Sequence, residues 1–164
     1  KDLRKGGDLL FKTLKILQEI NDDFNLITFG KSDSINKETG LSLDCFDMGF
    51  ISKDKDLALI YSAADILIMP SRMESFGQVA SESMACGTPV IGFNTSGIKD
   101  IIDDNENGFL VNKFDCSEMA HKINIYLKND LMRRNFESKA REKALKMWSY
   151  DAVASKYINL YKSN

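Results

Sequence analysis

The chain has 164 residues, of which 43% are hydrophobic and 28% charged, and its net charge is −2. These values are typical of one globular domain with a single core, and they exclude a disordered chain. The basic residues are scattered, so no basic patch indicates nucleic acid as a partner, and no apolar run reaches the roughly 20 residues of a membrane span.

The start of the chain is polar, lacks an initiator methionine and contains Gly6 and Gly7. From Asp8 to Ile20 apolar residues recur at helical spacing, which predicts a first helix. Because a loop leads directly into this helix, we expect an excised domain from which a preceding strand has been removed.

Short apolar runs then alternate with helical patterns. We predict strands at 24–29, 45–51, 66–69, 90–93 and 108–111, and helices at 54–64, 76–86 and 98–102; the polar stretch 31–40 is left unassigned. Strands that alternate with helices over short connections indicate a mostly parallel sheet with helices on both faces. The predicted fold is therefore a Rossmann-like, doubly wound α/β domain.

After Phe114 the pattern is helical to the end of the chain, with a break near Trp148 and Tyr150. We expect Trp148, Tyr157 and Tyr161 to pack rather than to bind a ligand. His121, the single histidine, lies in a polar-faced helix and is expected to be solvated.

The cysteines are odd in number and lack C-x-x-C spacing, which favours small apolar side chains in a reducing cytoplasm over disulfides or catalysis. They are Cys45, Cys86 and Cys116.

A candidate anion site follows the strand at 66–69, since ligands of such sheets bind beyond the carboxyl ends of the strands. Ser75, with Gln78 three residues later, has the spacing of a capping box and predicts a helix start. Gly77 lacks a Cβ, so a ligand can approach the exposed backbone N–H groups closely. A phosphate is favoured at such a position.

Two carboxylates flank this helix start. Glu74 precedes the helix, and Glu82 lies one turn after Gln78 on the same face. Carboxylates are good acceptors for neighbouring hydroxyls, so the arrangement suits a ligand with a sugar at each end and a diphosphate between them.

The segment from Pro70 to Val90 carries Glu-Ser-Phe-Gly-Gln-Val-Ala-Ser-Glu from Glu74 to Glu82. It closely resembles the E-x7-E signature of the group 1 (family 4) glycosyltransferases of the GT-B fold. The likeness continues through Asn107-Gly-Phe-Leu-Val and the opening Arg4-Lys-Gly, and it spans essentially the whole chain. The resemblance implies that residues 1–164 form the nucleotide-sugar-binding C-terminal domain, whose N-terminal acceptor-binding domain is absent from this chain.

The resemblance also implies roles for individual residues. Glu74 would be the catalytic residue, which holds a hydroxyl of the transferred sugar and steadies the developing positive charge. Glu82 would bind the ribose hydroxyls of the nucleotide. The other implied donor-binding residues are Lys5 on the diphosphate, Gly30 at the turn that the nucleotide passes, Phe50 and Ile51 at the base, and Ser75, Phe76, Gly77 and Gln78 at the distal phosphate and sugar.

Two positions depart from the family pattern. The family usually pairs its lysine with an arginine a few residues upstream, a position that would precede Lys1, and Arg4 is a poor substitute. Where members often read G-G-x-x-E, this chain has Ser96-Gly97-Ile98-Lys99-Asp100. Whether Asp100 replaces the glutamate stays open.

The activity implied is a retaining, metal-independent transfer of a sugar from a UDP-type or GDP-type donor to a glycan or glycolipid, without a cofactor. The expected partners are the donor and the N-terminal domain. A cytoplasmic location is expected, and the longer enzyme could associate peripherally with the inner face of the membrane. The isolated chain should bind nucleotide weakly and should not turn over.

Two alternatives remain at this point. One is a non-catalytic module that binds nucleotide sugars, and the other is a nucleotide-sugar epimerase or hydrolase of the same architecture. A nicotinamide dehydrogenase is disfavoured because no G-x-G-x-x-G follows a strand.

Overall fold

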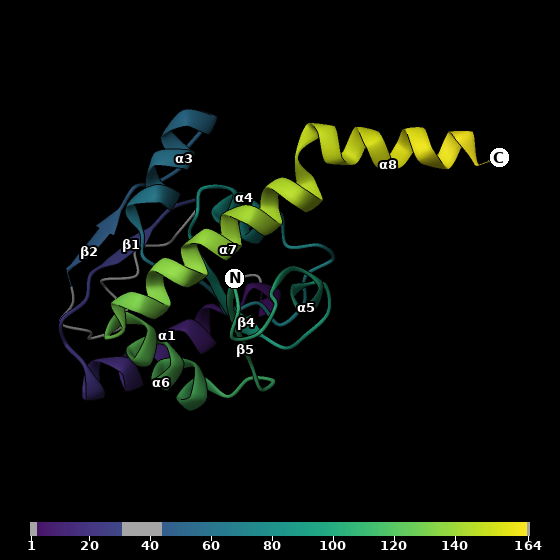
Figure 1. Cartoon of the computed structure of the whole chain (residues 1–164). Helices are drawn as coiled ribbons and strands as arrows, with labels where there is room; N and C mark the ends of the chain where they lie inside the picture. The colour runs from purple at the N-terminus through teal and green to yellow at the C-terminus, as the bar shows by residue number, and fades with distance from the viewer. Residues whose placement is uncertain (1–2, 31–43, 164) are drawn as a thin grey trace.

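The computed structural model describes residues 3–30 and 44–163 (Figure 1). Their elements are, in order, η1 (Leu3–Lys5), α1 (Gly7–Ile20), β1 (Leu26–Thr28), β2 (Cys45–Asp47), α3 (Asp54–Ala63), β3 (Leu67–Met69), α4 (Gln78–Ala85), β4 (Val90–Phe93), α5 (Ile98–Ile101), β5 (Gly108–Val111), α6 (Cys116–Leu127), α7 (Asp130–Trp148) and α8 (Tyr150–Lys162).

The predicted alternation of strands and helices is confirmed. The main differences are that β1 and β2 are shorter than the predicted strands 24–29 and 45–51, and that α4 begins at Gln78 rather than near Phe76. The unassigned stretch 31–40 lies outside the described residues.

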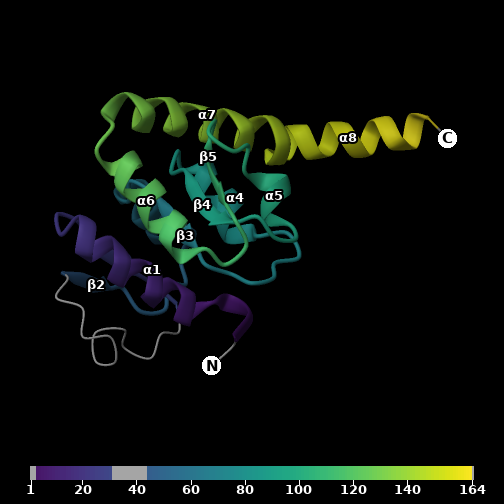
Figure 2. The ribbon, with the colours of Figure 1, turned by 90° about the horizontal axis from the view of Figure 1, so that it is seen from below.

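Strand β4 is the centre of a three-stranded parallel sheet in the order β3-β4-β5, and all four of its residues are buried. Because successive side chains of a strand point to opposite faces, β4 contributes to two separate cores. Ile91 and Phe93 join a cluster with α6, whereas Val90 joins a cluster with α4 and α5. Figure 2 shows α6 and α5 on opposite sides of this sheet. The Rossmann-like α/β class is thus confirmed.

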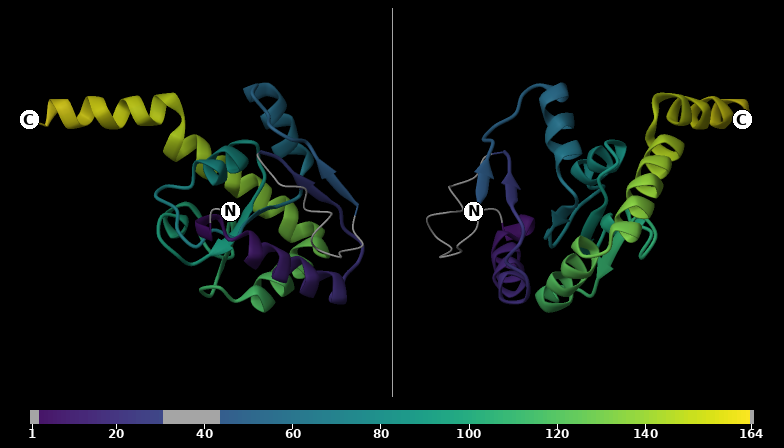
Figure 3. Two further views of the ribbon diagram at one scale, coloured as in Figure 1. Left: turned by 180° about the vertical axis from the view of Figure 1, so that it is seen from behind. Right: turned by 60° about the vertical axis from the view of Figure 1, so that its left-hand side comes forward.

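Strands β1 and β2 form a second parallel ladder, in which Leu26 pairs with Cys45 and Thr28 with Asp47. Within the described residues this ladder is not joined to β3-β4-β5, so the single sheet expected from the sequence is present as two parts (Figure 3). A cavity of about 560 Å³ lies between the two parts, and it is lined by residues of β1 on one side and of β3 on the other.

Helix α8 projects from the body of the molecule (Figure 1). Ser149 caps it by accepting a hydrogen bond from the Ala152 N–H at 3.2 Å, and none of its residues is buried. The expectation that Tyr157 and Tyr161 pack is therefore wrong for the described chain, where they are 60% and 77% exposed. The half-buried Trp148, just before the break, packs as expected against the core of α4 and α7. Among the helices of residues 3–30 and 44–163, none is long and apolar enough to span a membrane.

Candidate functional site

The amino end of α4 differs from the predicted capping box. Gly77, rather than Ser75, is the N-cap residue, with φ 85° and ψ 52°, and no side chain caps the helix. The left-handed backbone at Gly77 turns the chain before the helix begins, so Ser75 lies too early to cap it. Gly77 itself is buried, whereas Phe76 and Gln78 on either side are exposed. An amide end without a side-chain cap is the kind of position that favours an anion.

Glu74 lies just before this helix end, with its side chain only 14% exposed. Its Oε1 accepts hydrogen bonds from Lys5 Nζ at 2.6 Å and from Ser71 Oγ at 2.9 Å. The predicted diphosphate lysine and the predicted catalytic carboxylate therefore meet in an ion pair. Two donors fix the carboxylate in one orientation beside the helix end.

The turn after β4 supports the backbone of the Glu74 loop. The Glu74 N–H donates to Ser96 Oγ at 2.9 Å, and the Gly97 N–H donates to the Glu74 carbonyl at 3.0 Å. A Cβ on Gly97 would lie 2.6 Å from the Ser75 carbonyl oxygen, so this position has no room for a larger residue. Asp100, the uncertain substitute for the family glutamate, lies on α5 with an exposed side chain.

Arg72 holds the segment that carries Lys5. Its guanidinium donates to both carboxylate oxygens of Asp8, at 2.7 and 2.6 Å, and to the Leu3 carbonyl at 2.9 Å. The hydrogen bonds from Arg72 are the main reason that the pKa of Asp8 is lowered to about 2. The Arg72 N–H also donates to the Arg4 carbonyl at 2.7 Å. Lys5 is thereby kept next to the loop that follows β3.

Glu82 is held by a residue that the sequence does not single out. Its Oε2 accepts a hydrogen bond from Tyr61 Oη at 3.0 Å, and Tyr61 is 3% exposed. Burial is the main reason that the pKa of Tyr61 is raised, and the nearby Glu82 carboxylate raises it further. The phenol therefore stays a hydrogen-bond donor. Phe29, just after β1, packs edge-on against Tyr61 with 5.5 Å between the ring centroids.

The predicted base-binding residues lie beyond the β1–β2 ladder. The Gly30 N–H donates to the Gly49 carbonyl at 2.7 Å, and Gly30 has φ 100°. Phe50 is 73% exposed and Ile51 is half-buried. Through Phe29 and Tyr61, this end of the ladder is in packing contact with Glu82. The structure thus brings Lys5, Glu74 and the start of α4 together directly, and links Gly30 to Glu82 through two aromatic rings.

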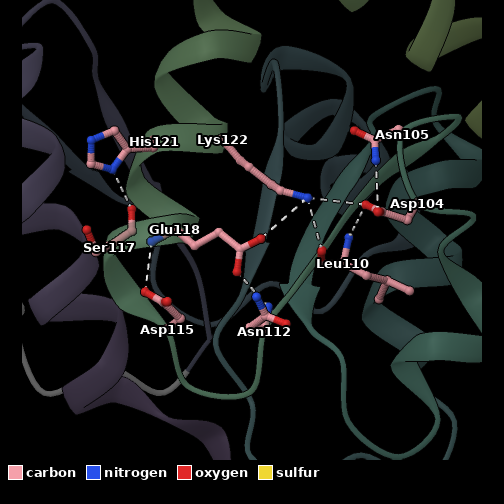
Figure 4. Close-up of polar contacts among 9 residues, drawn as sticks. All are labelled: Asp104, Asn105, Leu110, Asn112, Asp115, Ser117, Glu118, His121 and Lys122. Atoms are coloured by element: carbon pink, nitrogen blue, oxygen red, sulfur yellow. Dashed lines mark hydrogen bonds and ion pairs between the residues drawn. The ribbon is translucent and has the colours of Figure 1, made fainter.

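His121 lies on α6, away from these residues. It is exposed, and its Nδ1 is 2.8 Å from the Ser117 carbonyl of its own helix (Figure 4). Lys122 beside it donates to the Leu110 carbonyl at 3.2 Å and is ion-paired with Glu118 and Asp104. These contacts tie α6 to β5, and the prediction that His121 is solvated is confirmed. Within the described part of the chain, no group of three or more histidine, cysteine or acidic residues is arranged to hold a metal ion.

Sequence reasoning missed the residues that hold the two glutamates, which are Tyr61, Ser71 and Ser96, and it missed Arg72, which holds the segment that carries Lys5. Ser71 alone offered a local signal, because it lies three residues before Glu74. The others are far from their partners in the sequence, so only the folded chain pairs them.

Comparison with known proteins gives a family match. The sequence model of the family described as "Glycosyl transferases group 1" matches residues 2–143. The D-inositol 3-phosphate glycosyltransferase of Xylanimonas cellulosilytica is 30% identical over 168 residues, which cover 97% of this chain and 39% of that protein.

Two solved structures share the fold. The sucrose-phosphate synthase of Thermosynechococcus elongatus has a TM-score of 0.82 at 30% identity, over 99% of this chain and 43% of that one. The Anabaena protein HepE, crystallised with UDP-glucose, has a TM-score of 0.82 at 22% identity, over 100% and 47%. The chain therefore spans less than half the length of each of these three proteins.

Proposed function

Because this chain belongs to the group 1 glycosyl transferases, we propose that it is the donor-binding part of an enzyme that transfers a sugar from a nucleoside diphosphate to a glycan or glycolipid. The donor would be of the UDP or GDP type. The transfer would retain the anomeric configuration and would need neither a divalent metal nor a cofactor.

The observation that carries this proposal is the amide end of α4, which no side chain caps, together with one held carboxylate just before the helix and a second one turn into it. Gly77 leaves the first N–H groups of the helix without a side-chain cap. Glu74 before the helix and Glu82 within it each accept a hydrogen bond from a hydroxyl of the protein. A diphosphate suits the amide end, and hydroxyl-bearing sugars suit the two acids.

Lys5 and the helix end would stabilise the leaving diphosphate. Charge develops on that group as its bond to the sugar breaks, and positively polarised groups placed in advance lower the barrier. Lys5 is positioned for this role by the Arg72 contacts, but its ammonium is paired with Glu74. Donor binding would therefore transfer Lys5 from Glu74 to the phosphates.

Glu74, once released from Lys5, would hold a hydroxyl of the transferred sugar and steady the positive charge that develops there. Ser71 Oγ would keep its carboxylate in place at 2.9 Å. Glu82 would bind the ribose hydroxyls. Gly30, Phe50 and Ile51 would lie at the base, and Ser75, Phe76, Gly77 and Gln78 at the distal phosphate and sugar.

The acceptor side would come from an N-terminal domain of the longer protein, since the chain covers only 39% of the related inositol-phosphate enzyme. We further propose a cytoplasmic enzyme that contacts the inner membrane face peripherally. The chain alone is expected to bind nucleotide weakly and to catalyse no transfer, because it lacks the acceptor site.

NMR titration of the chain with UDP, GDP, ADP and their sugars tests the proposal. We expect saturable shifts of the Gly77, Gln78 and Glu82 amides with one nucleotide class, and tighter binding of the diphosphate than of the matching monophosphate. Glu82→Gln should weaken binding several-fold, whereas Glu106→Gln, an exposed acid on the turn before β5, should leave it unchanged.

If the chemical shifts of those amides do not change at saturating nucleotide, in both the chain and the full-length enzyme, donor binding is contradicted. The non-catalytic alternative is tested separately by Glu74→Ala in the full-length enzyme. Transfer activity should fall at least a hundredfold while donor binding persists, and unchanged transfer would exclude the catalytic role.

A further inference from the structure

Ser96, in the turn between β4 and α5, has a strained backbone. Its φ of 41° lies in the left-handed region, which is unfavourable for a residue with a Cβ. Among the described residues other than glycine, Asn105 at φ 61° and Phe114 at φ 65° share this region. Asparagine adopts it more readily than most residues, and the Phe114 ring packs edge-on against Phe93. Ser96 is exposed, so packing does not account for a serine at this position.

The Ser96 hydroxyl accepts a hydrogen bond and keeps its own proton available. The Glu74 N–H donates to Ser96 Oγ at 2.9 Å. A serine hydroxyl has one hydrogen to donate and two lone pairs that accept, so the amide of Glu74 leaves the hydroxyl hydrogen directed elsewhere. Within residues 3–30 and 44–163 that hydrogen is donated to no acceptor. The O–H can therefore be donated to a ligand.

The position of this hydroxyl is fixed relative to Glu74. The Gly97 N–H donates to the Glu74 carbonyl at 3.0 Å, and a Cβ on Gly97 would lie 2.6 Å from the Ser75 carbonyl oxygen. The turn after β4 is thus in direct backbone contact with the loop after β3. Since β3 and β4 are parallel neighbours, both loops leave the sheet at the carboxyl edge, where ligands of such sheets bind.

The two side chains offer complementary hydrogen-bonding groups. An ionised carboxylate such as that of Glu74 only accepts, whereas the Ser96 O–H donates. A sugar ring carries several hydroxyls, and each of them can both donate and accept. One acceptor and one donor held by the same backbone contact can therefore bind two hydroxyls of one sugar. A phosphate, which has only acceptor oxygens at its surface, suits the amide end of α4 better than a position beside Glu74.

We propose that Ser96 is a specificity-determining residue whose O–H donates to a hydroxyl of the transferred sugar, while Glu74 holds another hydroxyl of the same sugar. This inference rests on the proposed function. Glycine would relieve the backbone strain but would carry no hydroxyl, and strain of this kind gathers at functional sites. A site that donates to a sugar hydroxyl discriminates against a donor that lacks it, because the polar group of the site is then left unpaired.

Ser96→Gly separates the strain from the hydroxyl. NMR titration of the chain with UDP, GDP, UDP-glucose, UDP-galactose, UDP-N-acetylglucosamine and GDP-mannose identifies the tightest-binding sugar nucleotide, which then serves as the probe. We expect Ser96→Gly to weaken binding of the probe about five- to tenfold, as the loss of one hydrogen bond does. Its affinity for the matching nucleoside diphosphate should stay unchanged, and its urea midpoint should be no lower than that of wild type, because the strain is relieved.

Ser96→Ala removes the hydroxyl but keeps the strain. It should lose the same affinity for the probe and should unfold at a lower urea concentration than Ser96→Gly. Asn105→Gly is the matched control, because it relieves left-handed strain at an exposed residue on the turn before β5. It should leave the affinity for the probe and for the nucleoside diphosphate unchanged.

Deoxy forms of the probe distinguish a direct contact from a structural role. One deoxy sugar nucleotide, the form that lacks the hydroxyl bound by Ser96, should bind wild type and Ser96→Gly equally. The others should still bind the variant more weakly than wild type. If every deoxy form loses the same affinity in the variant, Ser96 acts only by supporting the Glu74 loop, and the proposal is overturned.

Two further results would overturn the proposal. One is an equal loss of affinity for the probe and for the nucleoside diphosphate, which would place the effect of Ser96 at the phosphates. The other is unchanged affinity of Ser96→Gly for every sugar nucleotide tested. Failure of wild type to bind any nucleoside diphosphate is a distinct result, because it contradicts the proposed function itself and the inference with it.

Discussion

The hydrogen bond from Tyr61 to Glu82 links a buried phenol to an acid that must also face solvent. The phenol donates a hydrogen bond to Glu82 at 3.0 Å, and its raised pKa keeps the phenol protonated at ordinary pH. It holds one carboxylate oxygen and leaves the other for a ligand hydroxyl. Tyr61 is thus a positioning residue for the proposed ribose contact.

Tyr61→Phe is expected to weaken nucleoside diphosphate binding about five- to tenfold, which corresponds to a hydrogen bond of about 1 kcal/mol. Calorimetry should show no such loss with a 2′,3′-dideoxy nucleotide, which offers Glu82 no ribose hydroxyls. Tyr126→Phe is the control, because that buried phenol donates to the Asp65 carbonyl at 2.9 Å. Equal losses with both nucleotides would show that Tyr61 acts through general packing.

At the scale of single residues, the sequence and the structure identify different members of the candidate site. Glu74 and Glu82 are identified by their spacing and by the residues between them. Tyr61 is 21 residues from Glu82, and Arg72 is 64 residues from Asp8, so no local pattern pairs them. The two proposed ligand-binding acids can be picked out from the sequence, but the groups that orient them depend on tertiary packing.

The Arg72–Asp8 ion pair should give a pH-dependent contribution to stability. The pKa of Asp8 is about 2 in the folded chain and about 3.9 in an unfolded one, so the pair stabilises above pH 4 and is lost as the pH falls toward 2. In urea unfolding, the difference between wild type and Arg72→Met should be constant from pH 7 to 5 and should shrink below pH 4. A parallel NMR titration should show the Asp8 pKa rising toward 4 in the variant.

Arg134→Met removes an exposed arginine and should show no such pH dependence. A difference between wild type and Arg72→Met that persists unchanged from pH 5 to 2.5 would mean that Arg72 stabilises the fold through its contact with the Leu3 carbonyl instead.

At the scale of single elements, the start of α4 shows why helix boundaries are hard to predict. Ser75 and Gln78 have the spacing of a capping box, but the chain between them turns at Gly77. That turn is set by tertiary contact, because Gly77 packs against Ile98 and Ile101 of α5. The local signal predicted a helix in the right place, and α5 determined at which residue it begins.

Gly77→Ala and Gly87→Ala form a matched pair, since both glycines have φ 85°. A Cβ on Gly87 meets nothing within 4 Å, so alanine there should cost only the left-handed backbone strain, about 1–2 kcal/mol. A Cβ on Gly77 meets Ile101 Cδ1 at 3.1 Å and Ile98 Cδ1 at 3.2 Å, so its replacement should cost a further 1–3 kcal/mol or so. Urea unfolding measures both losses, and equal losses would contradict the packing account.

At the scale of the whole molecule, α8 stands apart from the two cores. The cores of the sheet draw on α1, α4, α5, α6 and α7, whereas α8 buries no residue. Its apolar side chains, among them Leu160 at 57% and Tyr161 at 77%, remain exposed.

Removal of residues 150–164 should change the free energy of unfolding by less than about 1 kcal/mol, because little apolar surface leaves the core with them. Phe136→Ala in α7 is the comparison, since that ring is 3% exposed and its loss should cost about 3–5 kcal/mol. Thermal and urea unfolding measure both. A cost above 3 kcal/mol for the truncation would show that α8 packs against the body in solution.

The alternation of strands and helices was predictable because each element has its own apolar period. The division of the strands into two ladders was not, because the pairing partner of a short strand such as Leu26–Thr28 is not encoded in its three residues. The exposure of Tyr157 and Tyr161 was missed for a related reason. An apolar face on a helix predicts burial, but it does not say whether the covering surface belongs to the same chain.

The contact between Lys5 and Glu74 has a consequence for selectivity among anions. The ammonium of Lys5 and the carboxylate of Glu74 form an ion pair at 2.6 Å, so each neutralises the other. Free inorganic phosphate could attract Lys5 only by leaving Glu74 beside a second negative charge. On the proposed function, a sugar nucleotide would draw Lys5 away and would give Glu74 a hydroxyl in exchange, so the site should discriminate against the abundant small anions of the cell before any base or sugar is recognised.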